Sequence, residues 1–203
     1  MQIVPSSLCP AVRHRALAAR QAVDTAALLL LLLFALGSGT AQAVSGAEDP
    51  PVYNPASKSY FQLLKTTGKH GNWPESLEQA YRKTYKGVRG RLAVIDTPET
   101  HEFIMRNFDV SSEMWIGLRY WCEFRLLEWV GLRPFSPSDV DRFQLWHPQW
   151  SRGNQFCPPN ASGPGAFLGV YYQPTSKTSA LWQAVRTGKG FGLLLVEYPT
   201  GGQ

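Results

Sequence analysis

Residues 114–131 constrain the fold of this chain more than any other stretch, because they combine two strand signals with three tryptophans. Residues 115–118 read Trp-Ile-Gly-Leu, and bulky or β-branched side chains of this kind suit a buried, pleated surface. Gly117 has no side chain, so a neighbouring backbone can approach it closely. A second apolar run, residues 126–130, ends at Gly131. The stretch therefore predicts two adjacent strands in the middle of the chain.

A leader precedes the folded part. Residues 26–36 form an unbroken apolar run of 11 residues that follows three arginines and is too short to span a bilayer as a helix. Ala41-Gln42-Ala43 then fits the small-x-small pattern of a cleavage site. Residues 1–43 are predicted to be a secretory signal peptide, which makes the protein secreted or periplasmic. The alternative is an uncleaved membrane anchor.

Charge and cysteine content narrow the classes of function. Removal of residues 1–43 leaves 17 basic and 14 acidic residues, a net charge of +3. The basic residues are scattered and form no run interleaved with aromatic residues, so we expect no nucleic-acid partner.

Cys122 and Cys157 are the cysteines that remain. In an oxidising compartment they are expected to form a disulfide, and the alternative is a pair of buried thiols.

One domain is expected over residues 59–199, after an extended, proline-containing linker at 44–58 and before a tail at 200–203. Loops are expected at 133–141 and 147–165, and a loop as long as the second is usually functional. Residues 91–96 are expected to be a short strand or an extended segment. The further strand predictions are 60–64, a fragment at 143–146, and three closing strands at 167–172, 180–185 and 191–198, whose short connections imply an antiparallel sheet.

Two helix starts are recognisable. Asn72 can cap a helix, with Pro74 early in the first turn and Glu75 placed to reach back. Its apolar face is expected to extend through Thr84 and Tyr85, with the glycines that follow ending the helix. Thr97, followed by proline, begins a second helix.

This order of elements resembles the C-type lectin-like domain, an α+β fold in which two helices pack on antiparallel sheets with a long irregular loop. The resemblance runs from about residue 59 to 199. The motifs that carry it are Ala80, Leu92-Ala93-Val94-Ile95, Trp115-Ile116-Gly117-Leu118, Glu128-Trp129-Val130-Gly131, residues 143–146, Trp182 and Val196-Glu197-Tyr198.

The cysteines depart from the family pattern. Thr84 or Tyr85, and also Val196, stand where members of this family usually carry a cysteine. Cys157 matches the family's loop cysteine, but the usual partner shortly after Trp182 is absent. The resemblance thus leaves Cys122 as its mate.

The metal ligands depart as well. Sugar-binding members of this family hold calcium with a Glu-Pro-Asn or Gln-Pro-Asp triplet in the long loop and a Trp-Asn-Asp triplet on a later strand. The nearest equivalents here are Pro158-Pro159-Asn160 and Trp182-Gln183-Ala184, and residues 147–185 contain no Asp or Glu. Calcium needs several oxygen ligands, carboxylates among them. The resemblance therefore implies neither a metal site nor a cofactor here.

The best candidate contact residues lie in the 147–165 segment. Trp150 is the tryptophan expected to be partly exposed, and Asn154, Gln155 and Asn160 accompany it. Trp115, Trp129, Trp146 and Trp182 are expected in the core. His70, His101 and His147 share no short metal-binding spacing and are interpreted as surface histidines.

Three functions follow as hypotheses. The first is a calcium-independent binding module that recognises a protein, and the second is a lectin with an unusual site that binds a cell-surface glycan. The third is an enzyme on a related fold. No elbow motif surrounds any serine, and the chain lacks the paired late cysteines of the formylglycine-forming oxidases on that fold, so no catalytic residue is assigned. A membrane is a partner only if the leader is uncleaved. Asn160-Ala161-Ser162 is an acceptor sequence for N-glycosylation in a eukaryotic source.

Overall fold

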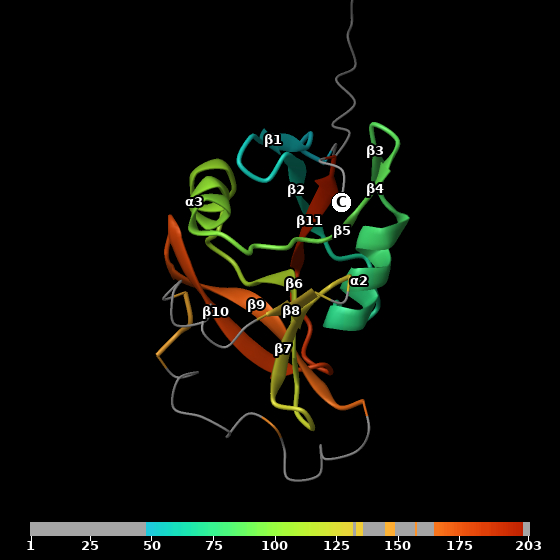
Figure 1. Cartoon of the computed structure of the whole chain (residues 1–203), viewed down its shortest axis with the longest axis vertical. Coiled ribbons are helices and arrows are strands. Elements are labelled where there is room, and N and C mark those ends of the chain that lie inside the picture. Colours follow the sequence, from blue (N-terminus) through green and yellow to red (C-terminus); the bar gives the residue numbers. More distant parts are fainter. Residues whose placement is uncertain (1–47, 132, 136–144, 149–156, 158–164, 201–203) are drawn as a thin grey trace, which may run out of the picture. The chain divides into compact units, whose positions relative to one another are not determined.

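The computed structural model describes residues 48–131, 133–135, 145–148, 157 and 165–200. Within these residues two helices, α2 (Trp73–Arg82) and α3 (Pro98–Asn107), lie at opposite sides of the central strands (Figure 1). The sheet is nine-stranded, and β3 (Thr84–Tyr85) and β4 (Val88–Arg89) form a separate two-stranded sheet. Among the described residues, no helix is both long enough and apolar enough to cross a bilayer.

The main sheet has one continuous path and two branches. The path is β1 (Val52–Asn54), β2 (Ser59–Lys65), β11 (Leu193–Pro199), β6 (Met114–Trp121), β7 (Leu126–Trp129) and β8 (Arg133–Phe135). β5 (Arg91–Leu92) pairs with β11, while β9 (Phe167–Ser176) pairs with β6 and with β10 (Ser179–Arg186). All pairs are antiparallel except β6 with β11. The α+β class predicted from the sequence is confirmed.

Both helices begin where the sequence predicts. The Asn72 side chain accepts the Glu75 amide at 3.0 Å, and the Thr97 side chain accepts the Thr100 amide at 3.2 Å. Each cap satisfies one of the amides that the first helical turn leaves without a partner. Glu75 itself reaches back to the His70 amide rather than to its cap residue.

The first helix is shorter than predicted. It ends at Arg82, and residues 84–85 are strand β3 instead of a last helical turn. Lys86 and Gly87 both have positive φ, at 49° and 77°, as the central residues of a tight hairpin turn require. The Tyr85 ring packs against Tyr60 and Tyr198, which favours the strand over the helix.

Two more strands occupy stretches that the sequence assigns to linker and loop. β1 lies in the expected linker, where Tyr53 stacks on its cross-strand neighbour Tyr60 with ring centroids 4.9 Å apart. Such aromatic pairs stabilise strand pairing. β8 begins the expected 133–141 loop and pairs with β7 through Pro134, opposite Glu128. It ends the sheet path, and proline is tolerated on an edge strand.

The closing strands differ from the expected three-stranded antiparallel sheet. β9 and β10 form the predicted hairpin, but β11 pairs with β2, β5 and β6 instead of β10. Gly190 redirects the chain, since it bridges to Asn72 and a Cβ there would lie 1.7 Å from the His70 carbonyl oxygen. Only glycine fits this crossing, which brings the chain to the Lys65 end of β2.

The core contains the predicted tryptophans of the central strands. Trp115, Trp129 and Trp182 are buried, and Trp146 is half-buried. The indole nitrogen of Trp115 donates to the Gly71 carbonyl at 2.7 Å. The indole of Trp73 donates to the Ile116 carbonyl at 2.9 Å. These bonds connect the start of α2 to β6 while satisfying buried polar groups.

Glu197 is a buried carboxylate that connects three segments. It accepts the Ser59 hydroxyl at 2.8 Å, the Arg91 guanidinium at 3.0 and 3.2 Å, and the Val94 amide at 3.0 Å. Burial of a carboxylate is costly unless it is paired and hydrogen-bonded, and here both conditions are met.

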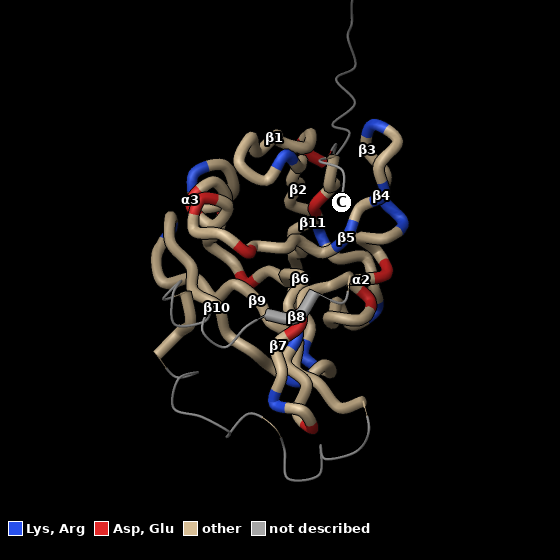
Figure 2. Tube along the Cα trace, in the orientation of Figure 1, with Lys and Arg blue, Asp and Glu red and all other residues tan. Residues whose placement is uncertain are grey.

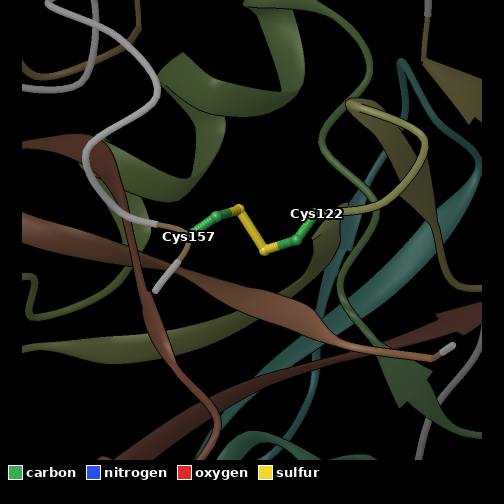
Figure 3. Close-up of a disulfide and its surroundings, with 2 residues drawn as sticks. All are labelled: Cys122 and Cys157. Atoms are coloured by element: carbon green, nitrogen blue, oxygen red, sulfur yellow. A yellow bond between two sulfur atoms is a disulfide. The ribbon is translucent and has the colours of Figure 1, made fainter. Parts of the chain in front are cut away.

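Cys122, at the end of β6, forms a disulfide with Cys157, with a Cα–Cα distance of 5.7 Å (Figure 3). The two cysteines are 35 residues apart in the sequence. The predicted pairing is confirmed, and it anchors one point of the 147–165 segment to the main sheet.

Replacement of Glu197 by alanine is expected to lower the free energy of unfolding by about 3 kcal/mol, because it leaves Arg91 and the Val94 amide without their buried acceptor. Urea denaturation measures this change. The matched control is Glu78→Ala, which breaks an exposed ion pair with Arg82 and is expected to cost no more than ~0.5 kcal/mol. Equal effects of the two substitutions would contradict the role of Glu197.

The double substitution Cys122→Ala and Cys157→Ala is expected to lower the free energy of unfolding by about 2–4 kcal/mol, since the bridge closes a long loop in the unfolded chain. Urea denaturation of both proteins without reductant measures the difference, and reductant is expected to reduce the wild-type value to that of the variant. Two free thiols in unreduced, denatured wild-type protein would show that the bridge does not form.

Candidate ligand-binding face

β10 occupies the place at which the resemblance puts a metal-binding strand. Trp182 packs edge-to-face against Trp129 and Trp146, with both centroid distances 5.7 Å. Its backbone amide donates to Leu145 at 2.6 Å, and its carbonyl accepts from His147 at 2.8 Å. The first residues of the 147–165 segment are thereby held against the edge of β10.

The two residues after Trp182 lack the chemistry of a calcium site. Gln183 is buried, and its side-chain oxygen accepts the amide of Ala184 at 3.2 Å. Ala184 is also buried and contributes only a methyl group. In the part of the chain that the structure describes, no three His, Cys, Asp or Glu side chains are grouped closely enough to hold a metal ion.

The 147–165 segment is attached at two described points. His147 is bonded to β10, and Cys157 is bonded to Cys122. The candidate contact residues Trp150, Asn154, Gln155 and Asn160 all lie outside the described residues. Their predicted role therefore stays a prediction.

A pocket that sequence reasoning missed opens beside the second half of β10. It has a volume of about 620 Å³ and is lined by residues of β9, β10 and the following turn: Tyr171, Gln183, Ala184, Val185, Arg186, Gly188 and Lys189. Tyr171 and Gln183 are directly opposite each other in the β9–β10 register. The alternation of side chains along each strand puts Tyr171 and Gln183 on one face of the sheet. The turn that brings Lys189 next to them depends on the chain crossing at Gly190.

A hydrogen-bonded network lies on the other face of β9. His101 of α3 and the Tyr172 hydroxyl are 2.7 Å apart, and the buried Trp182 lies directly opposite Tyr172 in the β9–β10 register. Burial lowers the pKa of His101 to about 4 and raises the pKa of Tyr172. The interpretation of His101 as a surface histidine is therefore wrong, because it lies one helical turn from the buried Ile104 and packs toward the sheet with it.

Because His101 has a lower pKa in the folded chain than in the unfolded chain, protonation favours unfolding. The contribution of His101 to the free energy of unfolding is complete above about pH 6.5. It decreases as the pH falls towards 4, by at most about 1.4 kcal/mol per pH unit. Urea denaturation between pH 7 and 5 measures this slope. His101→Gln keeps a hydrogen-bonding side chain but does not titrate, so a wild-type slope in that variant would contradict the assignment.

Lysine and arginine residues are distributed over several elements, including the β3–β4 hairpin, α3 and the β6–β7 hairpin (Figure 2). Exposed apolar side chains occur at the tip of the β6–β7 hairpin, where Phe124 is 66% exposed. The pocket beside β10 combines an aromatic wall, a buried amide and two exposed cations.

No family model matches the chain, and no curated protein matches it. Solved structures to which it is similar include C-type lectin domains. The domain of murine dendritic cell inhibitory receptor 2, solved with an N-glycan, has a TM-score of 0.49 and 20% identity and covers 75% of this chain and 99% of its own. The mouse scavenger receptor C-type lectin domain has a TM-score of 0.49 and 14% identity, and the match covers 74% of this chain and 98% of that domain. The Ca²⁺-independent C-type lectin SPL-2 from Saxidomus purpuratus has a TM-score of 0.47 and 18% identity, and the match covers 71% of this chain and 88% of that chain. These similarities concern the backbone arrangement and identify no ligand.

Proposed function

We propose that this chain is a secreted or periplasmic binding module, without catalytic activity, that recognises a protein or a cell-surface glycan through residues 147–165 and does not require calcium. The observation that carries the proposal is the chemistry of β10. Its Gln183 amide is turned onto the neighbouring backbone, and Ala184 offers no oxygen in its side chain.

Ligand chemistry supports independence from calcium. A calcium ion in a protein takes six to eight oxygen ligands, and carboxylates provide much of the binding. Residues 147–185 supply only neutral oxygens, because they include no Asp or Glu.

The attachment of the segment supports a role in recognition. Binding residues are often carried by loops that a rigid scaffold positions. Residues 147–165 leave the buried tryptophan cluster at Trp146 and are anchored again by the disulfide at Cys157. The residues between these points include Trp150, whose large amphipathic ring is well suited to protein or sugar contacts.

The leader and the disulfide support an extracytoplasmic location. Disulfides persist in secreted and periplasmic proteins and are rare in the cytosol. The Cys122–Cys157 bridge therefore supports export of the folded domain.

Binding is expected to be unchanged when calcium is removed by EDTA, and calorimetric titration with calcium chloride is expected to show no stoichiometric site. Trp150→Ala is expected to weaken binding by about tenfold or more, as loss of a central aromatic contact does. Retention on panels of immobilised extracellular proteins and polysaccharides measures both effects, and protease or glycosidase treatment of the ligand distinguishes the two ligand classes.

Phe124→Ala is the matched control, because it removes an exposed aromatic ring from the β6–β7 hairpin. It is expected to leave binding unchanged. A tight calcium site, or binding that disappears with EDTA, would contradict the proposal. Equal loss in the Trp150 and Phe124 variants would contradict the role of residues 147–165.

A further inference from the structure

The pocket beside β10 contains a buried polar group that is not fully used within the protein. Gln183 is only 5% exposed and lines the pocket. Its side-chain oxygen accepts the Ala184 amide at 3.2 Å. Its side-chain nitrogen makes no hydrogen bond to a described residue, and it is not one of the fully buried polar atoms that lack a partner, so it is accessible from the pocket. The amide nitrogen can therefore donate to a molecule in the pocket.

The opposite wall is a fixed aromatic ring. Tyr171 lies across from Gln183 in the β9–β10 register, and its ring is packed on Phe191, with centroids 4.4 Å apart, and edge-on to Trp115 at 6.0 Å. Because both neighbours hold it, Tyr171 presents a rigid surface at little entropic cost. A flat apolar surface of this kind suits the C–H face of a sugar ring better than the thin, flexible side chain of an acidic peptide.

The mouth of the pocket is positively charged. Arg186 and Lys189 both line it and are exposed, and the Lys189 amide donates to the Arg186 carbonyl at 3.0 Å, which holds the turn. Neither cation has an ion pair with a described carboxylate. Glu113 influences Tyr171, whose pKa is raised to about 12 chiefly by burial, but it does not line the pocket.

We propose that this pocket binds an acidic sugar, a single hexose ring that carries a carboxylate. The ring lies on Tyr171, the carboxylate pairs with Lys189 and Arg186, and the Gln183 amide nitrogen donates to a ring hydroxyl or to the carboxylate. A volume of about 620 Å³ accommodates one sugar ring together with bound water.

None of the residues that line this site belongs to the 147–165 segment, since all of them lie in β9, β10 or the turn after β10. It needs no cation, because the protein supplies the positive charge. Trp150→Ala tests the 147–165 segment and leaves this pocket intact, so the two proposals can fail independently.

The direct test compares D-glucuronate with D-glucose, which differ only by a carboxylate in place of a hydroxymethyl group. The full chain, expressed with its own leader and kept in EDTA, is titrated with each sugar while ¹H–¹⁵N spectra are recorded. Glucuronate is expected to bind at least about tenfold more tightly than glucose and to shift the amides of Tyr171 and of residues 183–189. Its affinity is expected to decrease with added salt.

Two variants locate the binding. Gln183→Glu keeps the acceptor for Ala184 but replaces the donor with a negative charge, and the double variant Arg186→Gln and Lys189→Gln removes both cations from exposed positions. Each is expected to reduce glucuronate affinity by about tenfold or more. Lys177→Gln, at the exposed β9–β10 turn outside the pocket, is the matched control and is expected to bind as the wild type does.

Three results would overturn the proposal. The first is equal affinity for glucose and glucuronate, and the second is a glucuronate affinity that does not change in the double variant. The third is that glucuronate shifts none of these amide signals while an acidic peptide such as tetraglutamate does shift them. The exposed double variant keeps the test decisive if Gln183→Glu fails to fold.

Discussion

The fold depends on the close contact between β6 and the extended segment after β5, and this contact is possible only because residue 117 is glycine. The Gly117 amide donates to the Ala93 carbonyl at 2.8 Å, and its carbonyl accepts the Val130 amide at 2.7 Å. A Cβ at this position would lie 2.6 Å from the Leu92 carbonyl oxygen and 2.8 Å from the Val130 side chain. Any side chain would push these backbones apart. The two neighbours of Gly117 then fix the surroundings, because Ile116 accepts the Trp73 indole and Leu118 is buried beside Trp129 in the β6–β7 register.

Much of this arrangement can be predicted from the sequence, where the signal is local. The helix caps at Asn72 and Thr97, the strand at residues 115–118 and the close approach at Gly117 follow from residue types at short spacing. Where tertiary contacts decide, the prediction is wrong. Tyr85 leaves its helix to pack on Tyr60 and Tyr198, and β11 joins β2 instead of β10 because Gly190 crosses Asn72. No local pattern contains these contacts.

Of the candidate site, too, only the features that depend on residue type can be predicted from the sequence. The missing carboxylates at Gln183 and Ala184 can be recognised in the sequence, because ligand chemistry depends on residue type. The pocket cannot, since Tyr171, Gln183 and Lys189 come together only through strand register and a turn. The role of His101 depends on Tyr172, 71 residues away, and its spacing from other histidines gives no hint of it.

These observations describe a scaffold in which one strand, β10, is central to both proposals. Its buried Trp182 holds the start of the 147–165 segment, and its outer residues form one wall of a cationic pocket.

A crystal structure of the full chain grown in calcium chloride, with anomalous data, tests the central claim most directly. The account predicts no cation between Gln183 and residues 147–165. A cation held beside Asn160 by carboxylates from elsewhere in the chain, such as Glu123 or Asp139, would contradict it.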